Sequence, residues 1–521
     1  MNSFIQRHRD VVIGQLNGFD RIRFRGSKRL LCTVGGMFHF LIRIKVLLKD
    51  FKDYAMSVTE QVRQASVQVA QAAGRPVEYL ASSSQRKEDI ARRIIAQDKL
   101  TEGLVCMLTS VEPCRSYRVR GNGAAKKLEL VGEPMKCLHH YHYYLHPQLG
   151  LLNVRLQTWF PFTIQVCLNG REWLARQLDH QGIGYRRKEN CFVQISNVAR
   201  AQELMDQQLR ADWPTLLGEL AERINPADAA LLQACPVPYY WSVQESEWAS
   251  DVLFHTPAAL ARLYPRLIRH GITTLASPDV MRFLGYRLPA HGKVNRNFDG
   301  QVLSDLRDRP EGVRIKHRVN TASIKMYDKQ GSVLRVETTV NNPRDIKVYR
   351  TKEGQPAGKK TWRQLRKGVA DLHRRAQVCQ AANDRYLQAM AAVETDASLA
   401  ELAGPVCRPI TWKGQPVRGL NPLADADARL LQAIARGEFA LHGFRNRDLR
   451  PLLFDRPADD LAEYRRQSGA VTRKLRLLRA HGLIRKVSAT HRYLLTACGH
   501  KVVAALLSAR QANTAKLLNA A

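Results

Sequence analysis

The sequence predicts a multidomain α+β protein with antiparallel sheets in its central domains. Three observations support this fold class. The chain has 521 residues, which is too long for one hydrophobic core. Its 45% apolar content is enough to build packed cores. Alternating apolar and polar residues, typical of half-buried strands, recur between 104 and 342, whereas helical periodicity prevails near the C-terminus. We expect five segments: 1–103, a basic ribbon and helices; 104–210, an α+β sheet domain; 211–350, a second α+β region; 351–422, a basic helix and hinge; and 423–521, a domain built around a basic helix.

The charge of the chain favours a polyanionic partner. Lysine and arginine number 81 against 47 acidic residues, which gives a formal net charge of +34. Nucleic acid is the first candidate partner and an anionic membrane surface is the second, and the charge alone does not distinguish DNA from RNA. The stretch 37–48 is too short, and too interrupted by charge, to span a bilayer. We therefore expect a nucleic acid partner and no membrane.

The cysteines and the N-terminus point to the cytoplasm. Ten cysteines are scattered along the chain without a Cys-x-x-Cys pair, which argues against a zinc ribbon and against a disulfide framework. The first ten residues lack the layout of a signal peptide. No phosphate-binding loop of the Gly-x-x-x-x-Gly-Lys-Ser/Thr type occurs, so an ATP-driven motor is not expected.

A stretch near the C-terminus has the pattern of a two-sided helix. Val471, Leu475 and Leu478 recur at helical spacing and form an apolar stripe. Gly482 follows at the point where a helix end requires a positive φ. Two short strands, 484–487 and 492–495, come next. The remaining side chains of this stretch that could face a partner are mostly cationic: Thr472, Arg473, Arg476, Arg479, Arg485, Lys486 and Arg492.

This order of a short helix, a basic helix, a glycine and a hairpin resembles a winged helix-turn-helix. The resemblance implies that the basic helix enters the major groove of DNA and that cations of the wing contact phosphates. The seven residues above are then the nucleic-acid contacts. The alternatives are a solvated basic helix in an ordinary α-helical domain and a winged helix that contacts protein.

A second basic stretch lies near the N-terminus. Arg21, Arg23 and Arg25 would share one face of a strand, with Ile22 and Phe24 on the other. One interpretation is a ribbon that grips phosphates, and the other is an edge strand with a solvated face. The nucleic-acid contacts predicted here are Arg21, Arg23, Arg25, Lys28 and Arg29.

The stretch 323–340 predicts a hairpin with a polar face. Ile324 and Met326 alternate with Lys325 and Tyr327, and a turn at 330–332 leads to a second alternating strand. This register places Lys325 opposite Glu337 and Tyr327 opposite Arg335.

The Tyr327-Asp328-Lys329 sequence, followed by Leu334-Arg335-Val336-Glu337, resembles a hairpin of replication initiators from rolling-circle plasmids and filamentous phages. The resemblance covers about twenty residues. It implies an origin-binding protein that nicks DNA, with Tyr327 and Glu337 as catalytic candidates and no nucleophilic role assigned. The alternative is a salt-bridged, half-exposed hairpin without chemistry.

Histidines cluster between 139 and 146. On a strand, His140 and His142 point to the same face, which is the spacing that two imidazoles need to share a metal ion. Acidic third ligands are scarce nearby. The other interpretations are rings that stack unpaired bases and a purely structural role. The aromatic cluster 159–162 is expected to fill a core.

Two expectations concern the region before the C-terminal domain. The sequence predicts one long helix over 361–393. The stretch 404–422 has four prolines and three glycines and is expected to be a hinge.

Two hypotheses of different class follow. The first is a nucleic-acid-binding protein of a mobile element, plasmid or phage-derived locus, which docks DNA through its C-terminal domain. The second is a metal-dependent DNA-nicking replication initiator, with Mg²⁺ or Mn²⁺ as cofactor. A structural RNA-binding protein is a third reading of the same charge.

Overall fold

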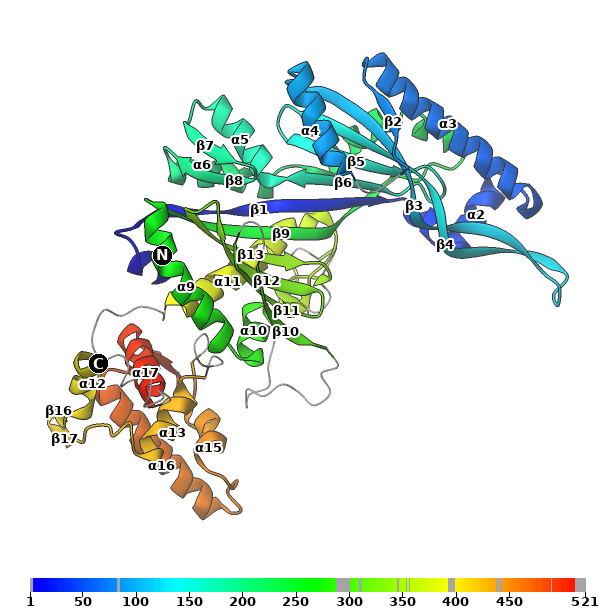
Figure 1. Ribbon diagram of the computed structural model, residues 1–521. Helices are drawn as coiled ribbons and strands as arrows, with labels where there is room; N and C mark the ends of the chain where they lie inside the picture. The colour runs from blue at the N-terminus through cyan, green and yellow to red at the C-terminus, as the bar shows by residue number, and fades with distance from the viewer. Residues whose placement is uncertain are drawn as a thin grey trace. The chain divides into compact units, whose positions relative to one another are not determined.

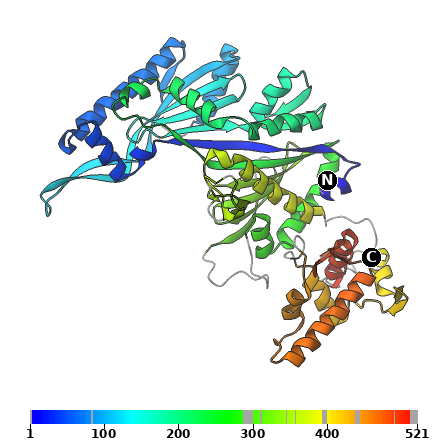
Figure 2. The same cartoon turned by 180° about the vertical axis from the view of Figure 1, so that it is seen from behind.

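The computed structural model describes residues 3–510 apart from 82–84, 287–299, 309–311, 344–345, 353, 356, 392–398, 437–438, 440–442 and 489. The chain is mixed α+β, with a large mixed sheet and several two-stranded antiparallel sheets (Figures 1 and 2). It divides into two compact units. The sheet unit contains Val12–Pro257 and Asp328–Gln380, and the second unit contains Met1–Val11, Ala258–Tyr327 and Ala381–Ala521. Both units are discontinuous in sequence, unlike the five consecutive segments predicted above.

The strands of the sheet unit are β1 (Val12–Ser27), β2 (Val77–Tyr79), β3 (Gly103–Asn122), β4 (Lys127–His146), β5 (Gly150–Gln157), β6 (Ile164–Asn169), β7 (Tyr185–Lys188), β8 (Cys191–Ile195), β9 (Tyr240–Phe254), β13 (Val333–Val340), β14 (Lys347–Arg350) and β15 (Thr361–Gln364). Its helices are η1 (Arg29–Cys32), α2 (Val34–Arg43), η2 (Leu48–Asp50), α3 (Phe51–Ala72), α4 (Lys87–Asp98), α5 (Gly170–His180), α6 (Val198–Asp206), η3 (Gln207–Leu209), α7 (Trp213–Ile224), α8 (Asp228–Leu231) and η5 (Val369–Asp371), and α11 (Leu372–Met390) begins here.

Eight of these strands form one sheet in the order β13-β9-β1-β6-β5-β4-β3-β2. Neighbouring strands are antiparallel, except that β2 runs parallel to β3. β1 is an internal strand, because β6 pairs along one of its edges and β9 along the other. It was predicted as a strand but with an edge position as one alternative, and that alternative is wrong.

Helices cover both faces of the β3–β4 end of the sheet. Successive residues of a strand point to opposite faces. Met107 packs in a cluster with Ala70 of α3, whereas Leu108 packs with Ile90 and Ala91 of α4. α3 and α4 therefore lie on opposite faces of the sheet.

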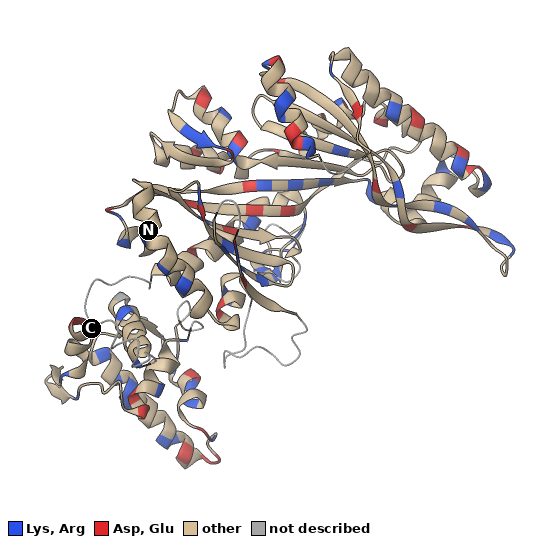
Figure 3. Cartoon of the chain, viewed as in Figure 1, with Lys and Arg blue, Asp and Glu red and all other residues tan. Residues whose placement is uncertain are grey.

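The distal halves of β3 and β4 form a two-stranded arm. β5 pairs with β4 only over His139–His146, and β2 pairs with β3 only over Met107–Thr109. Residues 113–136 consequently pair with each other alone, and this segment is called the arm below. Figure 3 shows basic residues along it.

The second unit contains α1 (Ser3–Arg7), α9 (Pro257–Thr273), α10 (Ser277–Phe283), β10 (Val302–Arg307), β11 (Arg314–Val319), β12 (Ala322–Lys329), α12 (Leu399–Cys407), β16 (Ile410–Trp412), β17 (Gln415–Val417), α13 (Asp425–Ile434), α15 (Asn446–Leu453), α16 (Leu461–Ala480), β18 (Ile484–Lys486), β19 (Tyr493–Leu495) and α17 (Ala497–Arg510). The elements from α12 to α17 share one hydrophobic core, to which Val406, Leu430, Leu475 and Val502 contribute.

Many predicted elements are confirmed. The sequence pattern predicts a helix over 170–180 and a strand over 191–195, and Gly170–His180 is a helix and Cys191–Ile195 a strand at these bounds. The predicted helix over 361–393 is wrong in its first part, because Thr361–Gln364 pairs with β14 and the helix begins only at Leu372. The predicted hinge at 404–422 is instead structured, and its Val406 and Leu420 are buried in the C-terminal core.

No helix in the described residues combines the length and apolar character needed to cross a bilayer.

Candidate nucleic-acid interface and buried charge cluster

α16 is the central helix of the C-terminal core. The Asp460 carboxylate caps its first turn by accepting a hydrogen bond from the Glu463 amide at 2.7 Å. Its end is at Gly482, whose φ of +69° confirms the predicted glycine stop. Val471, Leu475 and Leu478 are all buried, as the apolar stripe predicted. The opposite side of the helix is consequently turned away from this core.

The exposed side of α16 is cationic. Thr472, Arg473 and Arg476 are exposed, as expected. Arg465 is also exposed and lies on the same side, because it precedes Arg473 by eight residues and Arg476 by eleven. The prediction missed Arg465, although this spacing could have identified it. Between them lies Gly469, which has no side chain to hold a ligand away from the helix.

Neighbouring elements hold this helix and some of its cations. The Asn446 side chain of α15 donates to the Ser468 carbonyl at 2.7 Å and to the Thr472 hydroxyl at 2.9 Å. Arg476 donates to the Gln415 side chain. The Arg479 guanidinium lies 5.4 Å from the centre of the Trp412 ring and is half-buried. Arg479 is therefore less available to a partner than Arg473.

The predicted hairpin after α16 is confirmed as β18 and β19. Arg485 pairs with Leu494 and Lys486 with Tyr493, and a bridge joins Tyr493 to Phe444. Arg485 and Lys486 are exposed, whereas Arg492 is half-buried. The structure therefore places Arg485 and Lys486 where a partner could reach them.

The arginines of β1 have partners within the sheet. Arg21 contacts Glu245 and Glu247 of β9 at 3.1 Å each, and Arg23 contacts Glu245 at 3.2 Å. Both arginine side chains are more than one third exposed, so these ion pairs are weak. Two of the arginines predicted to grip phosphates, Arg21 and Arg23, are thus already paired with glutamates of β9.

The three other predicted contacts in this stretch differ from each other. Arg25 is exposed, and Arg29 is exposed with its guanidinium 3.3 Å from the centre of the Tyr240 ring. Lys28 is 1% exposed, and its ammonium donates to Asp228 at 2.8 Å and to the Val237 carbonyl at 2.7 Å. The prediction for Lys28 is wrong, because its charge is satisfied inside the protein.

A buried charge cluster lies on the face of the sheet that carries α5. Arg335 of β13 is fully buried and donates twice to the Asp251 carboxylate of β9, at 2.6 and 2.8 Å. Arg171 of α5 contacts the same carboxylate at 2.9 Å. Asp20 of β1 lies 3.3 Å from Arg335 and accepts two hydrogen bonds from the Asn190 amide.

A β-bulge brings Asp20 to this face. The register between β1 and β9 shifts between Phe19 and Arg21, which leaves Asp20 as the extra residue. Phe19 packs against Trp248 on the other face, and Arg21 contacts Glu247 on this one. Asp20 and Arg21 therefore project to the same side.

The bulge also brings three carboxylates together. Oxygens of Asp20, Glu247 and Glu337 lie within 4.8 Å of one another. In the described residues this is the one group of three or more His, Cys, Asp or Glu side chains close enough to hold a metal ion. Carboxylate oxygens are the ligands that Mg²⁺ and Mn²⁺ prefer.

The two central aspartates titrate differently. Burial raises the pKa of Asp20; Arg335 opposes the rise, and Glu337 adds to it. For Asp251, burial acts in the same direction, but Arg335 and Arg171 outweigh it and hold the pKa below its usual value. Asp20, which lies beside Glu337, is thus the aspartate whose charged form is less favoured. A cation bound at these carboxylates would favour the charged form of Asp20.

The two predicted catalytic candidates, Tyr327 and Glu337, lie on different strands and differ in burial. The strands β12 and β13 confirm the predicted hairpin elements, and Gln330 and Gly331 both have positive φ in the turn. Tyr327 is half-buried on β12 in the second unit. Glu337 is 2% exposed in the sheet unit, so the half-exposed hairpin considered as an alternative is wrong for this strand.

The residues that surround Glu337 were missed because β9 was not predicted as a strand. It supplies Glu247 and Asp251, and its alternation is hidden because both faces are buried beyond Glu247. The alternate spacing of the apolar Trp241 and Val243 was the pattern that could have predicted a strand here. That spacing gives no indication of the bulge at Asp20.

His140 and His142 lie side by side on β4, with ring centres 6.2 Å apart. They are 1% and 0% exposed, on the α3 face of the sheet, so they cannot stack on bases as one interpretation expected. Burial lowers the pKa of His140 to about 3, helped by His142 and Arg63, and that of His142 to about 4. In the described residues no third His, Cys, Asp or Glu joins them.

Comparison with protein-family models, with curated proteins and with solved structures finds no similar entity.

Proposed function

We propose that the chain is a nucleic-acid-binding protein of a mobile element, plasmid or phage-derived locus, and that α13 to β19 form a winged helix-turn-helix that docks DNA. The observation that carries the proposal is the exposed side of α16, where Arg465, Arg473 and Arg476 surround Gly469. A helix fits the major groove, and arginine makes two hydrogen bonds to guanine there. The exposed Arg485 and Lys486 are placed for phosphates.

The order of elements supports this proposal. α15 packs against α16, and α13 packs against α15, so three helices precede the β18–β19 hairpin. Winged helices have this order, with the last helix in the groove and the hairpin beside it. The net charge of +34 adds attraction to phosphates that does not depend on sequence.

The test compares binding of random and selected duplex DNA by the full chain and by the double variant Arg473→Gln, Arg476→Gln. We expect the variant to lose sequence preference and to bind the selected duplex more weakly, by about 1–3 kcal/mol for each lost arginine–guanine contact. Arg429→Gln on α13 is the matched control, because it removes an exposed arginine outside the α16 surface. Unchanged preference in the double variant would refute the proposal. Tighter binding of a discrete copurified RNA than of any duplex would favour the RNA-binding alternative.

A second candidate function is metal-dependent strand nicking. It is supported by the position of Glu337, a catalytic candidate of the initiator resemblance, beside Asp20 and Glu247. These residues would hold Mg²⁺ or Mn²⁺, which polarises a phosphodiester. The pair His140 and His142 is left out of this proposal because, in the described residues, no third His, Cys, Asp or Glu joins it.

Incubation with supercoiled plasmid and Mg²⁺ or Mn²⁺ tests the nicking activity. We expect open-circular product from the parent chain and none from Glu337→Gln, with Asp10→Asn at an exposed site as control. Absence of product with every metal, from a protein that binds the plasmid, would rule the activity out.

A further inference from the structure

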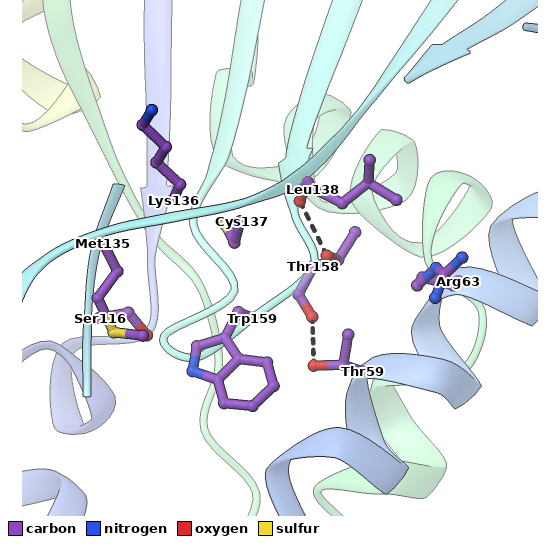
Figure 4. Close-up of a pocket in the computed structure, with 9 residues that line it drawn as sticks. All are labelled: Thr59, Arg63, Ser116, Met135, Lys136, Cys137, Leu138, Thr158 and Trp159. Carbon is purple, nitrogen blue, oxygen red and sulfur yellow. Dashed lines mark hydrogen bonds between the residues drawn. The ribbon is translucent and has the colours of Figure 1, made fainter. Parts of the chain in front are cut away.

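A cavity of about 250 Å³ lies at the base of the arm, between α3, β4 and the segment that follows β5. Figure 4 shows its lining: Thr59, Arg63, Ser116, Met135, Lys136, Cys137, Leu138, Thr158 and Trp159. The volume is about eight times that of a water molecule in the liquid and lies just below the usual range of small-molecule sites. There is room for one flat ring system and little more.

The walls of this cavity are fixed to each other. The Thr59 hydroxyl of α3 donates to the Thr158 carbonyl at 2.9 Å, and the Thr158 hydroxyl donates to the Leu138 carbonyl of β4 at 2.8 Å (Figure 4). On the arm side, the Ser116 hydroxyl donates to the Phe160 carbonyl at 2.6 Å. Behind the cavity, Phe160 and Phe162 are buried in the core, as the aromatic cluster predicted. A site held in this way needs little rearrangement to accept a ligand.

Trp159 differs from the rest of that cluster. It is half-buried, and its ring borders the cavity (Figure 4). Its Nε1–H is buried and has no acceptor among the described residues. A buried donor without an acceptor is unfavourable, so a ligand with a suitably placed oxygen or nitrogen atom would be stabilised here.

Two exposed cations, Arg63 and Lys136, lie at the edge of the cavity. Arg63 is exposed, and its one ion pair among the described residues is a half-exposed contact with Glu60 at 3.0 Å. Such a pair is weak enough for a phosphate to displace. Lys136 is exposed on the neighbouring strand, and the arm that begins there carries Arg118 and Arg120, both 57% exposed.

We propose that this cavity binds one unpaired base of a single-stranded nucleic acid, stacked on the Trp159 indole, with Arg63 and Lys136 on its phosphates. An aromatic platform with cations along the backbone path is how proteins bind single strands without sequence preference. The unpaired indole N–H points along the plane of its ring and not at the stacked base, so it would donate to a sugar or phosphate oxygen of the same strand. The inference rests on the proposed nucleic-acid function, and it names unpaired strands as a substrate distinct from the duplex bound by α16.

The probe is a single-stranded DNA of about ten nucleotides with 2-aminopurine at a central position, within the usual footprint of such sites. Stacking quenches the fluorescence of 2-aminopurine, so we expect quenching on addition of the full chain. Trp159→Ala should abolish the quenching and weaken binding about tenfold, which is the range for loss of one stacked base. Trp159→Phe, which keeps a ring, should retain most of the quenching. Arg63→Gln should weaken binding without abolishing the quenching.

Trp362→Leu is the matched control, because Trp362 is 58% exposed on β15 and does not line the cavity. Unchanged quenching in Trp159→Ala, or no binding of the probe by the parent chain, would overturn the proposal. If Trp159→Ala does not fold, unchanged binding by Arg63→Gln overturns it. The variant Arg473→Gln, Arg476→Gln separates this proposal from the duplex-binding one, since it should bind the single strand as the parent does while losing duplex preference.

Discussion

Arg335 is a fully buried cation whose charge is balanced by carboxylates on two neighbouring strands. It contacts Asp251 on β9 and Asp20 on β1. Removal of one member of a buried ion pair leaves the other charge without compensation in a low-dielectric interior. The stability of the sheet unit therefore depends on all members of this cluster being present together.

We predict that Arg335→Met lowers the free energy of unfolding by about 3–5 kcal/mol, measured by urea denaturation. Methionine fills much of the volume of the arginine side chain, so the loss of stability would come mainly from the removal of the positive charge. Arg9→Met is the control, since the Arg9–Asp10 contact is exposed and should contribute nothing measurable. Equal stability of Arg335→Met and the parent would mean that Arg171 alone suffices for Asp251.

His142 makes stability depend on pH. Its folded-state pKa is about 4, below the ordinary value of 6.5, because burial disfavours the imidazolium. As pH falls, the unfolded chain takes up this proton first, so the stability is fully present above about pH 6.5 and declines toward pH 4. The decline attributable to this group is on the order of 2–3 kcal/mol.

The measurement is urea denaturation between pH 7 and pH 4. His142→Leu should flatten this dependence, whereas His39→Gln at an exposed position of α2 should not. The same slope in His142→Leu and the parent would show that other groups cause the decline.

The arm is an element that the sequence indicated only in pieces. The sequence pattern predicts four separate strands, at 104–110, 116–120, 127–131 and 137–145, and the structure joins them into β3 and β4. In the structure, half-buried and exposed residues alternate along Glu112–Arg115 and Glu133–Lys136. The sequence does not show this alternation, because a half-buried position holds the charged Glu133 and exposed positions hold Pro113 and Pro134.

We predict that Arg118→Gln with Arg120→Gln weakens binding to nucleic acid at low salt and reduces the slope of log K against log salt by about one to two. Both side chains are more than half exposed and share Glu133 as their partner. Filter binding over a salt series measures the slope. Arg92→Gln with Arg93→Gln on α4 is the control pair, and an equal effect of the two pairs would indicate general charge attraction only.

Local elements were largely predictable, while their long-range partners were not. The stripe of α16, the glycine at 482 and the turn at 330–331 each depend on residues a few positions apart. The cluster of Asp20, Glu247 and Glu337 depends on β1, β9 and β13, which are far apart in the chain. Lys28 shows the same limit, since its partner Asp228 is 200 residues away.

At the scale of the whole molecule, the C-terminal elements have a core of their own. Its buried residues run from Val406 to Leu506, with Leu402 and Leu507 packed against them. The predicted boundary at 423 would cut off Val406 and Leu420 from this core. The segment 399–521 begins at the start of α12 and keeps all of these core residues together, and its length is in the usual range of an independent domain.

We predict that the segment 399–521, expressed alone, folds cooperatively and binds duplex DNA with the sequence preference of the full chain. Thermal unfolding followed by circular dichroism tests the first part, and competition binding tests the second. The segment 423–521 is the matched control and should be less stable. A non-cooperative transition in 399–521 would show that the C-terminal core needs the rest of the chain.

The pairing of β1 with β9 has a consequence for biosynthesis. The partners are separated by between 213 residues, for Ser27 and Tyr240, and 242 residues, for Val12 and Phe254. A ribosome therefore releases β1 long before its neighbour is made, and during that interval one row of its backbone amides and carbonyls is open to other chains. Expression at reduced temperature or with abundant chaperones should raise the yield, because both measures protect an exposed strand while the chain is being completed.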